Sequence, residues 1–253
     1  EKLKQKGYAI VSGDGDIWHA IENSSDKGWI VDGKLYIDPK REEFLDLSKR
    51  LKDNGYHNDT QDWTEAWYAD MRGEGPKPVF GFFGPAWLIN YVIGQHAPDT
   101  AGDWAITEPP VGFFWGGTWV LANKNVLQNE AKKKAVADFI QWVTLDTSEQ
   151  GLQYFWANGT MVEGEQGTKD TVASSVVMAK SNGELDFLGG QNMFDVFVPA
   201  NKFATGKNLT QYDQSINDIW RNQVREYTAG NKSRDQAIAD FKSTVRDELG
   251  IDY

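Results

Sequence analysis

One stretch, WAITEPPVGFFWGGTWVL at residues 104–121, constrains the fold of this 253-residue chain more than any other. It contains two apolar runs typical of strands, separated by the pair Pro109-Pro110 and the pair Gly116-Gly117. Proline stiffens the backbone, whereas glycine permits conformations and close approaches that other residues cannot adopt. The stretch therefore predicts two short strands joined by a stiff crossing.

Three adjacent aromatic residues, Phe113, Phe114 and Trp115, precede the glycine pair Gly116-Gly117. Rings beside bare backbone N–H groups suit a flat ligand with hydroxyl groups, because the rings cover its apolar face and the amides bond its rim. A buried core strand explains the same residues, since aromatic side chains bury large areas. On this stretch alone the core interpretation is favoured, and the rest of the chain shifts the balance towards a ligand.

Composition excludes several function classes. The chain has 26 Lys and Arg against 37 Asp and Glu, a formal net charge of -11, which argues against a nucleic acid or an anionic membrane as partner. Cysteine is absent, so disulfides and thiolate metal sites are excluded, and no apolar run has the length of a membrane span. The 11 Trp residues exceed what core packing normally requires. A surplus of indole rings is typical of sugar-binding proteins, because the C–H face of a pyranose packs on an indole.

Strands alternate with helices along the chain, which predicts the α/β class. Apolar periodicity, caps and turn residues predict strands at residues 8–11 and 79–83 and a hairpin at residues 29–37. The same signals predict helices at residues 17–21, 38–54, 62–72, 87–93, 129–145, 148–158, 212–227 and 233–249. Residues 1–7 resemble the last turns of a helix, so we expect the chain to be a fragment.

Two carboxylates flank Gly15 directly after the first strand, where side chains often project into a site. They are Asp14 and Asp16, and Trp18 follows as a weaker candidate for stacking. A polar turn in which Asp16 caps the next helix explains the pattern equally well. A calcium loop is disfavoured because the five-ligand spacing is missing.

Two further places carry candidate ligand residues. Trp87 begins a helix after the Gly84-Pro85 end of a strand, at the kind of edge where open α/β sheets bind ligands. The amides of Gln191 and Asn192 follow a glycine pair and can both donate and accept hydrogen bonds, although a loop with a capping Asn explains them as well.

The order of these pieces resembles the family 1 extracellular solute-binding proteins of carbohydrate ABC importers, which are similar to maltose-binding protein. The resemblance spans essentially the whole chain. It is carried by KGYAIV at residues 6–11, GPAW at 84–87, GDW at 102–104, the proline pair at 109–110, WGG at 115–117, the helices at 132–145 and 148–157, LGGQN at 188–192 and the terminal helix after TAGN at 228–231. Relatives often carry tryptophan at the position of Ala86, which leaves open whether Trp87 takes over its stacking.

The resemblance implies two α/β lobes with a sugar bound between them. It implies a periplasmic-binding-protein-like (type II) lobe with a central mixed sheet flanked by helices, plus a partial second lobe. Residues 1–103 and 163–253 correspond to the carboxyl-terminal lobe, and residues 104–162 to a returning segment of the amino-terminal lobe. The first half of that amino-terminal lobe and the lipidated cysteine of the mature start have no counterpart here.

These features predict a protein that captures a mono- or oligosaccharide outside the cell and delivers it to ABC transporter permease subunits. We expect an extracellular, cell-surface lipoprotein or a periplasmic protein that meets the membrane only through a lipid anchor. We expect no catalytic residue, metal or cofactor. The predicted carbohydrate-binding residues are Asp14, Asp16, Trp18, Trp87, Trp115, Gly116, Gly117, Gln191 and Asn192.

The sequence also bears on three rival functions. A glycoside-active enzyme would need two carboxyl groups roughly 5–9.5 Å apart, and carboxylates near Asp14 and Asp16 are the alternative on which it would rest. A metal site is disfavoured because His19, His57 and His96 are scattered. A lectin-like β-sandwich is inconsistent with the long capped helices.

The predicted partial lobe has a consequence for packing. If half of a lobe is missing, the apolar faces of residues 104–162 lose their partners. We therefore predict partial exposure of Phe139, Ile140, Val143, Leu152 and Phe155. The expected consequence is self-association through this segment, retention of a nicked amino-terminal piece, or repacking.

Overall fold

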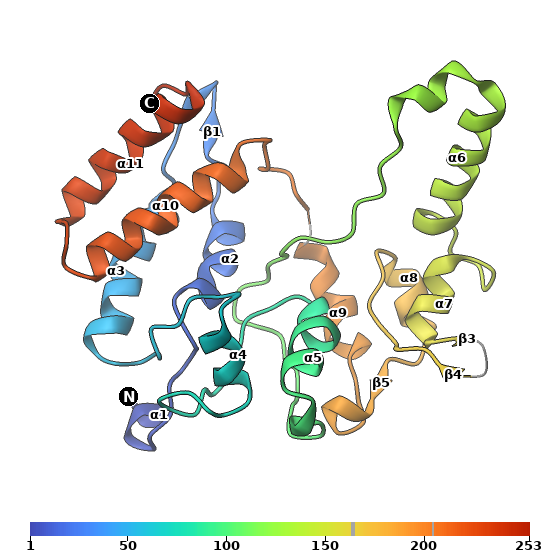
Figure 1. Cartoon of the computed structure of the whole chain (residues 1–253), viewed down its shortest axis with the longest axis horizontal. Coiled ribbons are helices and arrows are strands. Elements are labelled where there is room, and N and C mark those ends of the chain that lie inside the picture. The colour runs from blue at the N-terminus through green and yellow to red at the C-terminus, as the bar shows by residue number, and fades with distance from the viewer. Residues whose placement is uncertain (163–164, 204) are drawn as a thin grey trace. The chain divides into compact units, whose positions relative to one another are not determined.

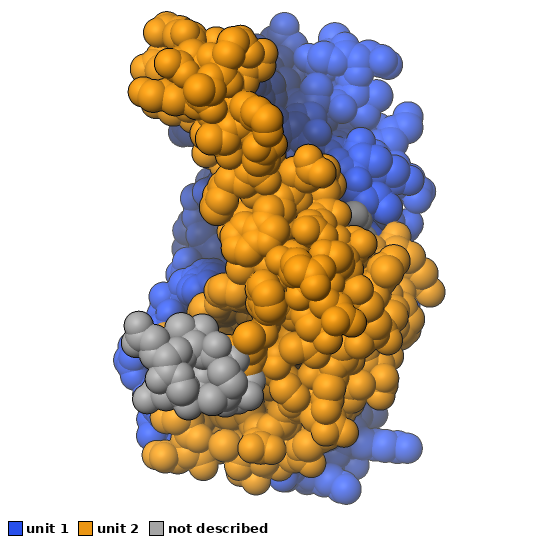
Figure 2. Space-filling view, turned by 90° about the vertical axis from the view of Figure 1, so that its right-hand side faces the viewer, with its two compact units in different colours: residues 1–83, 110–114, 203–253 blue, residues 84–109, 115–202 orange. Residues whose placement is uncertain are grey.

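The computed structural model describes residues 1–162, 165–203 and 205–253. The chain folds into two compact units, coloured separately in Figure 2. Unit 1 comprises residues 1–83, 110–114 and 203–253, and unit 2 comprises residues 84–109 and 115–202. These bounds differ from the lobes predicted from the sequence, and the assignment of residues 104–162 to a second lobe stays a prediction.

Unit 1 is built mainly of helices (Figure 1). Its elements are α1 (Lys2–Gln5), α2 (Gly15–Ser24), β1 (Ile30–Val31), β2 (Lys34–Leu35), α3 (Pro39–Asp53), α4 (Glu65–Met71), α10 (Asp213–Thr228) and α11 (Arg234–Leu249). The hairpin β1–β2 turns through Asp32 and Gly33, both at positive φ, as the Asp-Gly signal predicts. Asp38 caps α3 by accepting a hydrogen bond from the Lys40 N–H, and Ser233 caps α11 from the Gln236 N–H.

The core of unit 1 forms where α2, α3, α10 and α11 meet. Its centre is a cluster of fully buried rings, in which Trp29, Phe241 and Trp220 pack against one another, with the Trp29 centroid 5.2 Å from that of Phe241 and 5.8 Å from that of Trp220. The apolar faces predicted for α3 and α11 are those that contribute Phe44, Phe241 and Val245 to this core. Helix packing, rather than a sheet, thus holds unit 1 together.

The two single strands predicted in unit 1 are reduced to parallel bridges. Ala9 pairs with Val79, and Val11 pairs with His57. The Phe80 N–H still donates to the Ala9 carbonyl at 2.9 Å, but the run from residue 81 to 83 is irregular, so the strand predicted at 79–83 is wrong beyond its start. Besides these bridges, the described residues form three antiparallel hairpins, so they make a helix-rich α/β mixture, and the central mixed sheet stays a prediction.

Unit 2 contains shorter elements. They are a π-helix at Leu88–Ile93 continued by α5 (Gly94–His96), α6 (Glu130–Thr144), α7 (Leu152–Asn158), β3 (Met161–Val162) paired with β4 (Glu165–Gln166), α8 (Ser175–Ala179), β5 (Glu184–Leu185) paired with β6 (Gln191–Asn192), α9 (Phe194–Ala200), and 3-10 turns at Pro98–Thr100, Lys124–Gln128, Asp186–Leu188 and, extending into unit 1, Asn201–Phe203. Its core gathers Ile89, Ala157, Val177, Met193 and Phe194.

The capping box predicted at residues 147–150 is wrong. The Ser148 N–H donates to Asp146 at 2.8 Å and the Ser148 hydroxyl accepts from the Gln150 N–H, so these side chains close a turn. Helix α7 begins later, after Gly151, and ends at Gly159 in the left-handed conformation, as predicted.

The stretch at residues 104–121 forms no strand, contrary to the prediction. At Ile106, within this stretch, an amide side chain takes the place of a neighbouring strand. Gln191 accepts from the Ile106 N–H and donates to the Ile106 carbonyl, both at 2.8 Å. Residues 110–114 belong to unit 1, where the Phe114 carbonyl accepts from Asn23 at 3.1 Å.

The predicted exposure of apolar side chains in α6 and α7 is confirmed. No residue of α6 is buried, and Phe139 and Phe155 are exposed while Ile140, Val143 and Leu152 are half-buried. The exposed set includes side chains that the prediction did not name: Trp119, Leu121, Leu127, Trp142, Leu145 and Trp156. The helix α6 therefore has an apolar face without a core beneath it.

Candidate functional site

In unit 2, two of the predicted ligand residues form one aromatic pair. The rings of Trp87 and Trp115 meet edge to face, with centroids 5.0 Å apart and an interplanar angle of 66°. The Trp87 indole N–H donates to the Trp115 carbonyl at 3.0 Å, which fixes the orientation of the first ring against the backbone of the second. Both side chains are half-buried. The pair is thus a rigid aromatic corner at the surface of unit 2.

The glycine pair lies directly beside this corner. Gly116 has φ 67° and Gly117 has φ 146°, conformations that favour glycine, and both residues are exposed. A Cβ at Gly116 would lie 4.0 Å from the Trp87 indole nitrogen. Four of the predicted residues, Trp87, Trp115, Gly116 and Gly117, are therefore brought together.

In unit 1, the loop that carries Asp14 and Asp16 is held tightly from within. Asp16 is buried and accepts hydrogen bonds from the Ser12 N–H at 2.8 Å and the Trp67 indole N–H at 3.1 Å. Burial raises the pKa of Asp16 to about 7, against the effect of its N–H donors. Asp16 lies in the first turn of α2 and Asp14 occupies the cap position without a side-chain cap, so the predicted capping role of Asp16 is wrong. The carboxyl of Asp16 thus holds the loop in place through its hydrogen bonds. The side chain of Asp14, in contrast, is only half-buried.

Trp18 has no surface to offer to a ligand. Its side chain is fully buried, with its ring 5.0 Å from that of Phe44 and 6.2 Å from that of Trp29. The position places Trp18 in the core of unit 1, and we do not retain it as a stacking residue.

The side-chain amides of Gln191 and Asn192 form hydrogen bonds with the protein's own backbone. Both polar ends of Gln191 bond Ile106, as described above. The Asn192 side-chain oxygen accepts from the Phe194 N–H at 3.0 Å at the start of α9. This second contact closes a local turn just before α9, whose cap position is occupied by Met193 rather than by Asn192.

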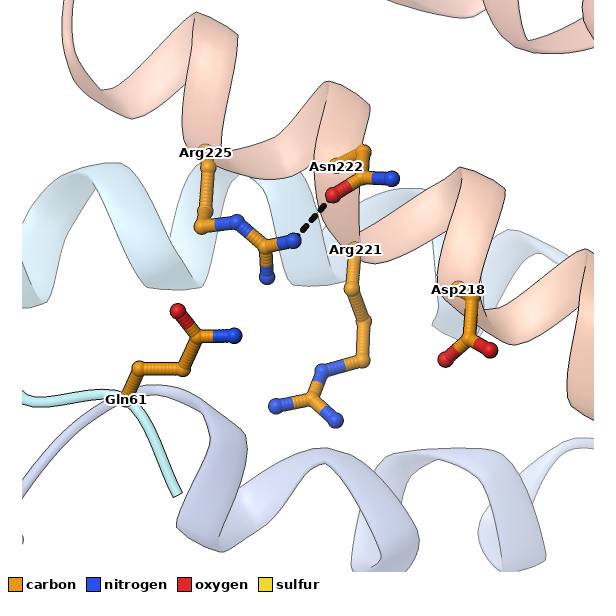
Figure 3. A pocket seen from close by; sticks show the side chains of 5 residues that line it. All are labelled: Gln61, Asp218, Arg221, Asn222 and Arg225. Atoms are coloured by element: carbon orange, nitrogen blue, oxygen red, sulfur yellow. Dashed lines mark hydrogen bonds between the residues drawn. The ribbon is translucent and has the colours of Figure 1, made fainter. Parts of the chain in front are cut away.

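Sequence reasoning missed a polar hollow of about 240 Å³ in unit 1 (Figure 3). Four of its lining residues are on α10, and the fifth comes from the loop before α4. The lining residues are Gln61, Asp218, Arg221, Asn222 and Arg225. Arg221 forms an ion pair with the buried Asp62, and Arg225 donates to Asn222. On the sequence, these residues are ordinary polar positions of an amphipathic helix, so no local signal marked them.

Two exposed tryptophans also escaped the sequence reasoning. Trp119, in unit 2, is 74% exposed, and Trp63, in unit 1, is 52% exposed. The sequence places Trp63 in a helix at residues 62–72 and Trp119 in a strand-like run, but in the structure α4 begins only at Glu65 and residue 119 lies in no regular element. Their exposure is notable because large aromatic side chains are usually buried.

Within the described parts of the chain, no group of three or more His, Cys, Asp or Glu side chains could hold a metal ion. None of the described helices combines the length and the apolar character needed to cross a membrane.

Comparisons with known proteins found structural similarity only. No family model and no curated protein matches this chain. A solved structure described as extracellular solute-binding protein family 1 superposes with a TM-score of 0.66 at 18% identity, covering 96% of this chain and 60% of that one. The ABC transporter associated binding protein from B. animalis subsp. lactis Bl-04, solved in complex with beta-1,6-galactobiose, superposes with a TM-score of 0.58 at 17% identity, covering 99% of this chain and 64% of that one.

The chain thus spans about 60% of the length of the solved proteins that it resembles. At this level of identity the likeness concerns the fold, which agrees with the resemblance inferred from the order of the sequence motifs. This chain has the fold of part of an extracellular solute-binding protein of family 1.

Proposed function

We propose that this chain belongs to a protein that binds carbohydrate outside the cell and delivers it to the permease subunits of an ABC transporter. The observation that carries the proposal is the corner of Trp87 and Trp115 beside the exposed backbone of Gly116 and Gly117. One of the structurally similar proteins was solved with a disaccharide, which supports a sugar as ligand. Placement at the cell surface through a lipid anchor, or in the periplasm, is part of the same proposal.

The chemistry of the corner suits a sugar ring. An indole ring covers the C–H face of a pyranose, while backbone N–H groups and carbonyls can bond the hydroxyls at its rim. Each aromatic contact contributes about 0.5–1.5 kcal/mol beyond the area buried. Because the two rings are held at 66° by a hydrogen bond from Trp87, little ordering is needed on binding.

The surroundings of Asp14 and Asp16 support a binding protein better than an enzyme. A raised pKa is what a general acid needs, and Asp16 has one. However, its oxygens accept from the N–H groups of Ser12, Gly13 and Trp67 in a buried position, where a glycosidic bond cannot reach them. The alternative of a glycoside-active enzyme near Asp14 and Asp16 is therefore not favoured.

The test is a titration of the chain with neutral mono- and disaccharides, including β-1,6-galactobiose and maltose, followed by tryptophan fluorescence and calorimetry. We expect Trp87→Ala and Trp115→Ala each to weaken sugar binding by about 3–10-fold or more. Trp156→Ala is the matched control, since Trp156 is an exposed tryptophan of unit 2 on α7. Binding of a peptide but of no sugar would refute the proposal.

A further inference from the structure

The loop before α4 contains a backbone conformation that its sequence does not favour. Among the described residues, Asp32, Asp59 and Trp63 are the non-glycine residues at positive φ. Asp32 occupies a hairpin turn, and aspartate tolerates this region. Trp63, at φ 64°, lies in no hairpin turn, and its bulky side chain disfavours this backbone conformation. Such strain persists only where the surrounding structure imposes it, and it concentrates at ligand sites.

The surroundings of this loop do impose its shape. The N–H groups of Asn58 and Thr60 both donate to the Ser12 carbonyl, at 3.0 and 3.2 Å. The Thr60 hydroxyl donates to Asp70 at 2.8 Å. A Cβ at Gly13 would lie 1.8 Å from the Thr60 carbonyl oxygen, so the contact between the two loops requires glycine there. The loop is thus clamped on unit 1 ahead of the strained residue.

The strained residue presents its ring instead of burying it. The Trp63 side chain is half exposed, and its ring centroid lies 5.5 Å from that of the fully buried Trp67. Trp67 is itself fixed by the hydrogen bond from its indole to Asp16. An exposed ring backed by a rigid one is a suitable platform for stacking.

The polar hollow lies next to this platform. Gln61 lines it, and Asp62 forms the ion pair with Arg221 at its wall. Two residues of chain span at most about 7 Å, so the backbone of Trp63 is close to that of Gln61. Figure 3 shows the side chains of Gln61 and Arg225 directed towards each other across the hollow.

The lining retains hydrogen-bonding capacity. Among the described residues, the Gln61 side chain makes no hydrogen bond, Asn222 uses only its oxygen, and Arg225 uses only one guanidinium nitrogen, to Asn222. A guanidinium has five N–H donors, and an amide has two donors and two acceptor sites. Asp218 adds acceptor oxygens to the same hollow.

The charges around the hollow exclude a strongly charged ligand. Arg221 forms an ion pair with Asp62, and the carboxylates of Asp14, Asp62 and Asp218 all interact electrostatically with Arg225. A carboxylate or an ammonium group entering here would meet like charges as well as opposite ones. The hydroxyl groups of a neutral ligand both donate and accept hydrogen bonds, so they can bond the donors and the acceptors of the lining without that repulsion.

We propose that this hollow and Trp63 form a second sugar subsite, which takes a single neutral ring. Its volume is below the roughly 300–1,000 Å³ of pockets for whole drug-sized ligands, which fits one ring rather than an oligosaccharide. Trp63 covers the apolar face of the ring, and Arg225, Asn222, Gln61 and Asp218 bond its hydroxyls. This proposal rests on the proposed function, since it presupposes a carbohydrate ligand.

The experiment compares Trp63→Asn and Arg225→Met with wild type by calorimetry against β-1,6-galactobiose, galactose and galacturonic acid. We expect each variant to bind a neutral sugar about 3–10-fold more weakly or worse. Trp156→Asn and Arg246→Met are the matched controls, because Trp156 is an exposed tryptophan of α7 and Arg246 is an exposed arginine of α11 that pairs with its neighbour Asp247. Melting temperatures are recorded for all variants.

Asparagine tolerates positive φ, so weaker sugar binding by Trp63→Asn without a lower melting temperature supports the subsite over a structural role for Trp63. Unchanged affinity in both variants, while Trp87→Ala weakens binding, overturns the subsite and leaves the proposed function standing. Tighter binding of galacturonic acid than of galactose overturns the assignment to a neutral ring. If wild type binds no sugar, both proposals fall together. Should Trp63→Asn not fold, Arg225→Met decides.

Discussion

Replacing Leu121 and Leu145 by glutamate is expected to make this chain more monomeric. These two side chains are 89% and 72% exposed, and six further large apolar side chains at residues 119–156 are exposed with them. Monomeric proteins seldom leave so much apolar surface uncovered, and association with a second copy would cover it.

The magnitude follows from the exposed fractions. Added together, the exposed fractions of the eight side chains equal those of between four and five fully exposed side chains. Burying each fully contributes about 1.5–3 kcal/mol, so covering the set contributes roughly 7–14 kcal/mol. Association costs an estimated 4–15 kcal/mol, mainly in lost freedom of motion. The difference is at most about 10 kcal/mol in favour of association, and a net gain of about 4–8 kcal/mol within that range corresponds to a dissociation constant between about 1 mM and 1 µM.

The assay is light scattering coupled to size-exclusion chromatography over a concentration series. Wild type is expected to gain mass with concentration, and more strongly at high salt, which screens the repulsion between copies of net charge -11. Leu209→Glu, in unit 1, is the control, because Leu209 is also exposed but lies outside the segment. A wild type that stays monomeric at about 1 mM would refute the reasoning, as would an equal effect of the control variant.

Three further substitutions test the packing and the electrostatics by urea unfolding. Phe241→Ala removes a fully buried ring from the core of unit 1, so we expect a loss of about 3–5 kcal/mol in the free energy of unfolding; a loss below about 1 kcal/mol would contradict that placement. Gln191→Leu leaves the Ile106 N–H and carbonyl without their partner, and we expect a loss of about 1–3 kcal/mol with little change in sugar affinity; a change in affinity alone would instead assign Gln191 to the ligand. Burial raises the pKa of Asp16 to about 7, so its contribution to stability is fully present below its unfolded pKa near 4 and is lost as pH rises through 7. The stability difference between wild type and Asp16→Asn is expected to shrink by at most about 4 kcal/mol between pH 4 and pH 8, and a difference independent of pH would show that Asp16 titrates normally.

Local signals in the sequence predicted the local structure well. The caps at Asp38 and Ser233, the turn at Asp32 and Gly33, and the left-handed helix end at Gly159 are where the sequence places them. Each of these features depends on residues within a few positions of one another, so neighbouring residues along the sequence determine it. The same holds for the apolar faces of α3 and α11, whose periodicity marks the side that is buried.

Strands were predicted less well, because a strand needs partners from elsewhere in the chain. The run at residues 79–83 has strand-forming residues, yet a partner backbone reaches only its start, through Ala9. At Ile106, within residues 104–121, the backbone bonds the side chain of Gln191 instead of a neighbouring strand, which no local pattern contains. Hydrogen bonds between strands are set by topology, which a single run of residues does not encode.

The tryptophans show most clearly what the sequence determines and what the tertiary structure decides. From the sequence, Trp18 and Trp87 are similar, since each lies at or near the start of a helix that follows a glycine-containing turn. Tertiary packing buries Trp18 against Phe44 and leaves Trp87 half exposed against Trp115, because only Trp18 lies within the core cluster of its unit. The surplus of tryptophan, the lack of cysteine and the acidic charge were determined by the sequence by itself. Which indoles can meet a ligand, and which polar residues of α10 enclose a hollow, was decided by contacts between residues far apart in the chain.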